Sequence, residues 1–141
     1  PIPDLTAQQE IDLATIAEEI TGIARERYQL HEDFRTTLRN EFGSGQDIST
    51  RIDLYRWWDF ENEAALSDDM QRRTGWEPIP LKQRSEWRKF LAEEKAKHAA
   101  FTAKIIEQET RMNAIVYDAF DLTPEERQLI EETTKYPYGE V

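Results

Sequence analysis

The chain has 141 residues, of which 38% are hydrophobic and 33% charged, and it carries a net charge of −11 at pH 7. It contains no cysteine, which excludes disulfides, thiolate zinc sites and cysteine nucleophiles, and is compatible with a cytosolic protein. No apolar run approaches the roughly 18 residues that a membrane span needs, so we expect no membrane partner.

The first long helix is predicted from about residue 6 to about residue 40. Thr6 and Gln9 have the spacing of a capping box, with Thr6 as the N-cap. Apolar residues then recur at alternating three- and four-residue steps, which is typical of a helical seam. The seam consists of Leu13, Ile16, Ile20, Ile23, Leu30, Phe34 and Leu38. The segment 43–45 (Gly-Ser-Gly) should end this helix.

The connector, residues 43–80, is the least regular and most aromatic part of the sequence. It contains Tyr55, Trp57, Trp58, Phe60 and Trp76. Ser49 or Thr50 could cap a short helix that runs through Trp58, and residues 60–73 could form another. Residues 75–80 should form a loop, because prolines on both sides of Ile79 prevent a continuous helix.

A second long helix is predicted from about residue 81 to about residue 118. Its apolar seam comprises Trp87, Leu91, Phe101, Ile105, Met112 and Ile115. Glu94, His98 and Gln108 interrupt that seam. Two seams of similar length joined by a connector favour an antiparallel helical hairpin. The fold class is therefore predicted to be all-α, with two long antiparallel, coiled-coil-like helices and an aromatic-rich connector.

A short third helix is predicted from about residue 124 to residue 134. Thr123 is the expected N-cap, Pro124 takes the first helical position, and Glu126 completes a second capping box. Leu129 and Ile130 are expected to form its buried face. Residues 1–141 would then make up one helical domain.

The net negative charge is unfavourable for nucleic-acid binding, because most non-specific affinity comes from basic side chains that neutralise phosphates. Basic residues are nevertheless concentrated in one window of the sequence. Between residues 72 and 97, eight basic residues outnumber four acidic ones. The basic residues are Arg72, Arg73, Lys82, Arg84, Arg88, Lys89, Lys95 and Lys97. They are candidate contacts to a DNA backbone if the fold brings them together. Alternatively they belong to solvated helix faces, since those on the second long helix point in several directions.

The sequence contains no recognisable catalytic, cofactor-binding or metal-ligating motif. Helix-borne metal sites in bundles use Glu-x-x-His, but Tyr28 precedes His31 at that spacing, and Lys95 precedes His98. His98 lies four residues after Glu94, and we interpret it as a polar interruption of a helix interface rather than as a ligand. We therefore predict no catalytic residue, cofactor or metal site on this chain.

Several segments near the end of the chain carry a family resemblance. They are residues 86–87 with the helix after them, 113–117 (NAIVY), 122–126 (LTPEE), 130–131 and 138–141 (YGEV). Together they resemble the C-terminus of the large adenine-specific DNA methyltransferases of type IIG and related single-chain restriction–modification systems, including those of phage-defence BREX islands. The likeness is specific from about residue 87 to residue 141, and the earlier part shares only the helical pattern.

The resemblance implies a parent enzyme that methylates adenine N6 in DNA with S-adenosylmethionine, in a bacterial or archaeal cytoplasm. The catalytic loop and cofactor motifs of that family are not in this sequence, which starts without Met, so we expect an excised C-terminal domain. It would be a non-catalytic scaffold that holds target-recognition and methyltransferase domains around double-stranded DNA. Asn113, Tyr117, Leu122 and Tyr138 would then be packing and capping positions.

Two alternatives belong to other functional classes. The chain could be an independent helical interaction module that self-associates through its two seams and has no DNA role. It could also be a bundle metalloprotein, but the missing ligand spacing argues against that reading.

Overall fold

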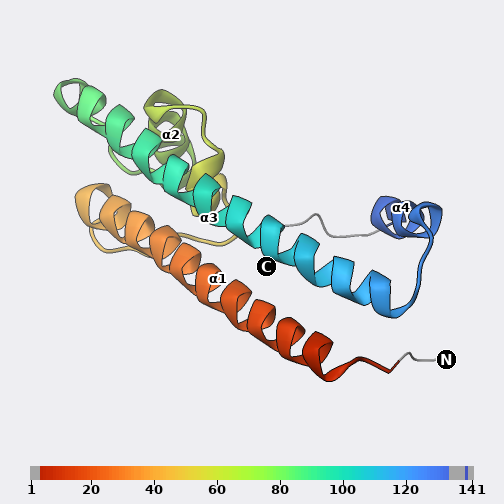
Figure 1. Cartoon of the computed structure of the whole chain (residues 1–141). Helices are drawn as coiled ribbons and strands as arrows, with labels where there is room; N and C mark the ends of the chain where they lie inside the picture. The colour runs from red at the N-terminus through yellow and green to blue at the C-terminus, as the bar shows by residue number, and fades with distance from the viewer. Residues whose placement is uncertain (1–3, 134–138, 140–141) are drawn as a thin grey trace. The chain divides into compact units, whose positions relative to one another are not determined.

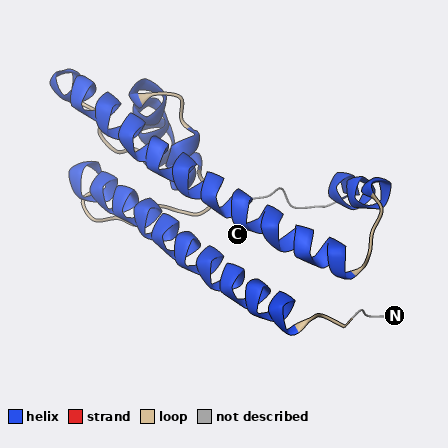
Figure 2. Cartoon of the chain, viewed as in Figure 1, coloured by secondary structure: helices blue, strands red, loops and turns tan. Residues whose placement is uncertain are grey.

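The computed structural model describes residues 4–133 and residue 139, and within these residues it contains helices and no strand (Figures 1 and 2). The elements in chain order are α1 (Ala7–Phe42), η1 (Asp53–Asp59), α2 (Glu63–Asp69), η2 (Met70–Thr74), η3 (Leu81–Gln83), α3 (Arg84–Ala119) and α4 (Pro124–Thr133). The predicted all-α class is confirmed. Among these helices, none is both long and apolar enough to cross a lipid bilayer.

The chain divides into two compact units, and both long helices pass through both of them. One unit combines Pro1–Glu26 with Phe101–Val141, and the other is Arg27–Ala100. In the second unit, His31 of α1 contacts His98 of α3, whereas Phe42 lies against Trp87. Because residue numbers rise along α1 as they fall along α3, the two helices are antiparallel. The predicted hairpin is therefore confirmed.

Capping explains where the helices begin. The amide of Gln9 donates to Thr6 Oγ1 at 3.1 Å, and the amide of Thr6 donates to Gln9 Oε1 at 2.9 Å. The same reciprocal pair joins Thr123 and Glu126 at the start of α4, at 3.1 and 3.2 Å. Both predicted capping boxes are confirmed, and each satisfies backbone donors that a helix start leaves unpaired. α1 ends at Phe42, directly before the predicted Gly-Ser-Gly break.

The short helices of the connector begin later than the sequence indicates. η1 starts at Asp53 and no side chain caps it, so the predicted cap at Ser49 or Thr50 is wrong. Instead, Ser49 Oγ accepts from the amide of Arg51 at 3.2 Å and closes a local turn. α2 is capped by Asn62, whose Oδ1 accepts from the Ala65 amide at 3.0 Å. Residues 75–80 form the predicted loop.

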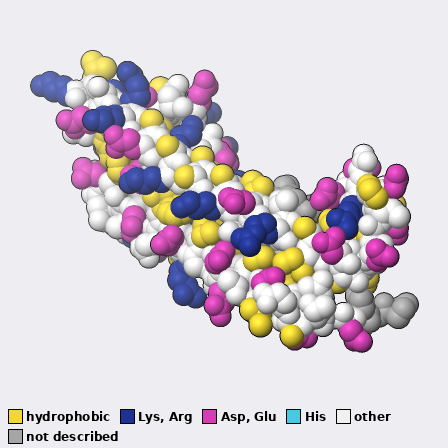
Figure 3. Space-filling model, in the orientation of Figure 1, with side chains coloured by type: hydrophobic (Ala, Val, Ile, Leu, Met, Phe, Trp, Pro, Cys, Tyr) yellow, Lys and Arg dark blue, Asp and Glu magenta, His cyan; other side chains and the backbone are white. Residues whose placement is uncertain are grey.

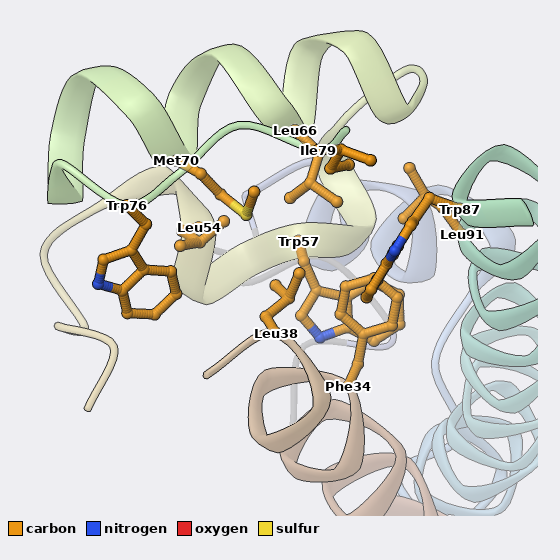
Figure 4. Close-up of a cluster of buried hydrophobic side chains, with 10 residues drawn as sticks. All are labelled: Phe34, Leu38, Leu54, Trp57, Leu66, Met70, Trp76, Ile79, Trp87 and Leu91. Atoms are coloured by element: carbon orange, nitrogen blue, oxygen red, sulfur yellow. The ribbon is translucent and has the colours of Figure 1, made fainter. Parts of the chain in front are cut away.

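Each unit has its own hydrophobic core. In Arg27–Ala100 the connector packs onto α1 and α3. Figure 4 shows the ten buried side chains of the resulting core. Trp57 is fully buried there and stacks on Phe34 with 4.0 Å between ring centroids. The other unit has a smaller core of Ile16, Ile20 and Ile105. The aromatic connector thus supplies most of the larger core.

α4 does not bury the apolar pair that the sequence assigns to its inner face. Leu129 is 61% exposed, Ile130 is 41% exposed, and no residue of α4 is buried. The helix is instead held at its N-terminal end, where Arg127 donates to the carbonyl of Leu122 at 3.2 Å and to Asp118 at 2.7 Å. The prediction of a buried face is therefore wrong. Residue 134 and the predicted packing position Tyr138 lie outside the described residues.

Candidate functional site

Three of the candidate DNA contacts lie on one face of α3 and tie that helix to the connector. Arg84, Arg88 and Lys95 are spaced by four and seven residues, which places them on the same side of the helix. Their acceptors are, in order, the carbonyl of Ile79 at 3.0 Å, the carboxylate of Glu63 at 2.8 Å and the carbonyl of Phe60 at 2.5 Å. These cations therefore hold the connector in place.

Two further candidates, Arg73 and Lys97, also have partners within the chain. Arg73 lies 3.6 Å from Asp53 and from Asp69, and Lys97 lies 3.0 Å from Glu94. The remaining three are Arg72, Lys82 and Lys89, which are exposed. In the described part of the chain we find no ion pair for those three. Figure 3 shows basic and acidic side chains interspersed on the visible face, with no continuous basic surface there.

Sequence reasoning missed a partly buried polar cluster where α1, α3 and the connector meet. His31 Nε2 and His98 Nδ1 are 2.8 Å apart and share a hydrogen bond across the two helices. The Trp58 ring stacks on His31 at 3.7 Å and on His98 at 4.9 Å. Trp57 Nε1 donates to the backbone carbonyl of His31 at 3.2 Å. The only signal in the sequence was the polar interruption at His98.

The surroundings of the two histidines disfavour the charged imidazolium. The pKa of His31 is lowered from 6.5 to about 3, chiefly by burial and then by the charges of His98, Arg35 and Arg27, in that order. Burial also lowers the pKa of His98, with Arg27 as the next cause. Both rings are therefore neutral at pH 7, so that one N–H donates to the other ring. A pKa this low makes His31 a poor general base near neutral pH.

Two buried carboxylates accompany the cations of the connector. Glu63 is 4% exposed and Asp69 is 2% exposed, and each has one oxygen without a hydrogen-bond partner among the described residues. The hydrogen bond from Arg88 lowers the pKa of Glu63. Burial raises the pKa of Asp69, and the nearby Asp53 carboxylate raises it further. The pattern is that of groups that order the connector, because Glu63 forms an ion pair with Arg88 and Asp69 lies 3.6 Å from Arg73.

No metal centre emerges from the described residues. They contain no group of three or more histidine, aspartate or glutamate side chains that could hold an ion. Glu94, the residue one turn before His98, forms its ion pair with Lys97.

Residues 6–116 match the model of a family described as a domain of unknown function (DUF8810), and the chain belongs to this family. The matched segment contains α1, the connector and nearly all of α3. No curated protein and no solved structure gives a significant match.

Proposed function

We propose that the chain is a non-catalytic helical scaffold of a DNA restriction–modification adenine methyltransferase, in which it supports target recognition and DNA positioning. The resemblance of its C-terminal segments to that enzyme family supplies the context. S-adenosylmethionine would be the cofactor of the parent enzyme and would bind outside this chain. The partners would be the methyltransferase and target-recognition domains, together with double-stranded DNA.

The observation that carries this proposal is the structural role of the segments that bear the resemblance. Tyr117 is 8% exposed, and its carbonyl accepts from the amide of Leu122 at 3.1 Å. The Arg127 guanidinium lies 5.7 Å from the Tyr117 ring and also binds Leu122 and Asp118. With Thr123 as N-cap, these residues form the corner between α3 and α4. They pack, cap and turn the chain, which is the work expected of a scaffold.

The reading frame that encodes the chain provides the most direct test of the parent enzyme. If the proposal is correct, an Asn-Pro-Pro-Tyr-type motif and an S-adenosylmethionine-binding region lie in frame upstream of Pro1. A start codon immediately before Pro1 would contradict it.

DNA positioning can be tested separately by fluorescence anisotropy with duplex DNA. Reversal of Arg84 or Arg88 is a poor test, because both side chains hold the connector. The better variant is Lys82→Glu with Lys89→Glu, and Lys104→Glu outside the basic window is the matched control. With three cations available, log K should fall against log salt with a slope of about −3, and the double variant should reduce the magnitude of that slope by about 2. Equal binding by the double variant and the control would refute contact through this window.

One observation favours the second candidate, a helical interaction module with no DNA role. Leu129 and Phe120, both in the unit that contains α4, are 61% and 49% exposed. Burying such apolar side chains against a partner would be favourable in free energy. Self-association would make thermal unfolding depend on protein concentration. A melting temperature that is constant over a hundredfold dilution would exclude self-association in this range.

A further inference from the structure

The geometry points to a binding pocket for a guanidinium group, carried by an arginine side chain of a partner protein. The pocket lies within the Arg27–Ala100 unit, between the last turns of α1 and the first turns of α3, and has a volume of about 450 Å³. Its lining consists of Thr37, Glu41, Gln83, Glu86, Trp87 and Phe90. This site is separate from the His31–His98 cluster and from the basic residues, and it does not depend on the methyltransferase proposal.

Two of the lining residues, Trp87 and Phe90, are aromatic. Phe34 stacks on one face of the Phe90 ring, with centroids 5.2 Å apart and planes at 9°. The Trp87 ring meets Phe90 nearly at right angles, at 80° and 5.5 Å. These contacts fix the rings while Phe90 remains partly exposed in the pocket. A rigid ring face of this kind attracts cations, and a flat guanidinium stacks on it better than an ammonium does.

The rim of the pocket is acidic. Glu41 and Glu86 approach it from different helices and are both exposed, and we find no cation paired with either one in the described part of the chain. Arg39, the basic residue in the last turn of α1, forms its ion pair with Asp47 at 2.6 Å and does not neutralise Glu41. Glu41 also lies at the helix C-terminus, where the helix dipole adds negative potential. The pocket therefore offers two carboxylates without an ion-pair partner in the described part of the chain, beside an aromatic lining.

An arginine side chain matches both features at once. Its planar guanidinium can stack on the Phe90 ring while its N–H groups donate to Glu41 and Glu86. Thr37 and Gln83 provide further polar atoms at the rim. The volume lies within the range of ligand pockets and leaves room for the backbone that carries the side chain.

The test uses the full chain labelled with ¹⁵N and a short capped peptide with one arginine, with a citrulline peptide as its neutral isostere. The arginine peptide should shift the amide signals of Glu41, Glu86 and Phe90 and the Trp87 indole N–H, with millimolar affinity. The citrulline peptide should leave them unchanged. Glu41→Gln and Glu86→Gln should each weaken binding by about 1.5- to 5-fold. Glu107→Gln, an exposed acid on the other unit, should not. Unchanged circular dichroism of the variants establishes that they remain folded.

Three results would overturn the inference. Equal binding of the citrulline peptide, or no shift with the arginine peptide at tens of millimolar, would show that the pocket does not recognise a guanidinium. If methylguanidinium binds as tightly as the peptide, the ligand of the pocket is a small cation and not a protein partner. Shifts of the same amides on dilution of the chain alone, lost when Glu41→Gln and Glu86→Gln are combined, would identify a second copy as the occupant.

Discussion

Acidification from about pH 7 to about pH 5.5 should destabilise the Arg27–Ala100 unit through its buried histidine pair. In the folded unit the pKa of His31 is about 3, against an ordinary value of 6.5, because burial and neighbouring arginines disfavour the imidazolium. Between these two pH values the unfolded chain binds a proton that the folded chain does not. The contribution of His31 to the free energy of unfolding is fully present above pH 6.5 and is lost as the pH falls toward 3.

The size of the effect follows from these two pKa values. For His31 alone, the free energy of unfolding should fall by about 1 kcal/mol between pH 7 and pH 5.5. His98 adds to this loss, since burial lowers its pKa as well. Asp69 acts in the opposite direction, because its raised pKa makes its contribution decrease as the pH rises.

Urea unfolding followed by tryptophan fluorescence reports the free energy of unfolding of the Arg27–Ala100 unit. All four tryptophans of the chain lie between residues 57 and 87. The pH range stays above the isoelectric point of about 4.7, where loss of net charge favours precipitation. The control is the double variant His31→Phe, His98→Phe, which retains Asp69 and every other carboxylate. Between pH 7 and pH 5.5, the free energy of unfolding of the wild type should fall by at least about 1 kcal/mol more than that of the double variant. An equal dependence of this free energy on pH in the two proteins would refute the reasoning.

The remaining predictions concern packing and can be checked by urea or thermal unfolding followed by circular dichroism. Trp57→Ala should cost about 3–5 kcal/mol because the side chain is fully buried, whereas Leu129→Ala, at a largely exposed position, should change stability by less than about 0.5 kcal/mol. Gly43→Ala should destabilise the unit, since the new methyl group would overlap the Trp76 indole. Gly22→Ala should stabilise α1 by about 1 kcal/mol, because it is a mid-helix glycine with open space beside it. Similar effects at the two glycines would contradict the packing at Gly43.

The long helices could be predicted from the sequence because their signals are local. The Thr6–Gln9 and Thr123–Glu126 boxes each need only residues three apart, and the apolar seams repeat within a few turns. The start of α2 could not be found in this way with the same certainty, because several residues of the connector are able to cap a helix. Asn62 does so, while Ser49 serves a local turn instead.

The failed prediction on α4 has a different cause. The pattern identifies Leu129 and Ile130 as the apolar side of the helix, but no local pattern states whether another segment covers that side. In the same way, charge counting placed eight basic residues in one window without showing that Arg84 and Arg88 are committed to the connector. The partners of Arg88 and Lys95 lie 25 and 35 residues away in the chain. Contacts at this distance depend on the tertiary fold.

The histidine pair joins residues 67 positions apart, and this distance suggests what such a cluster contributes to a helical hairpin. Apolar seams on two long helices can be paired in several registers, because a shift by one turn replaces one apolar contact with another. The same shift would separate His31 from His98 and break their partly buried hydrogen bond, at a cost of about 1 kcal/mol. Arg88 on Glu63 and Lys95 on the Phe60 carbonyl impose a similar cost on any movement of the connector along α3. The polar contacts therefore select one register for a hairpin whose apolar residues supply most of its stability.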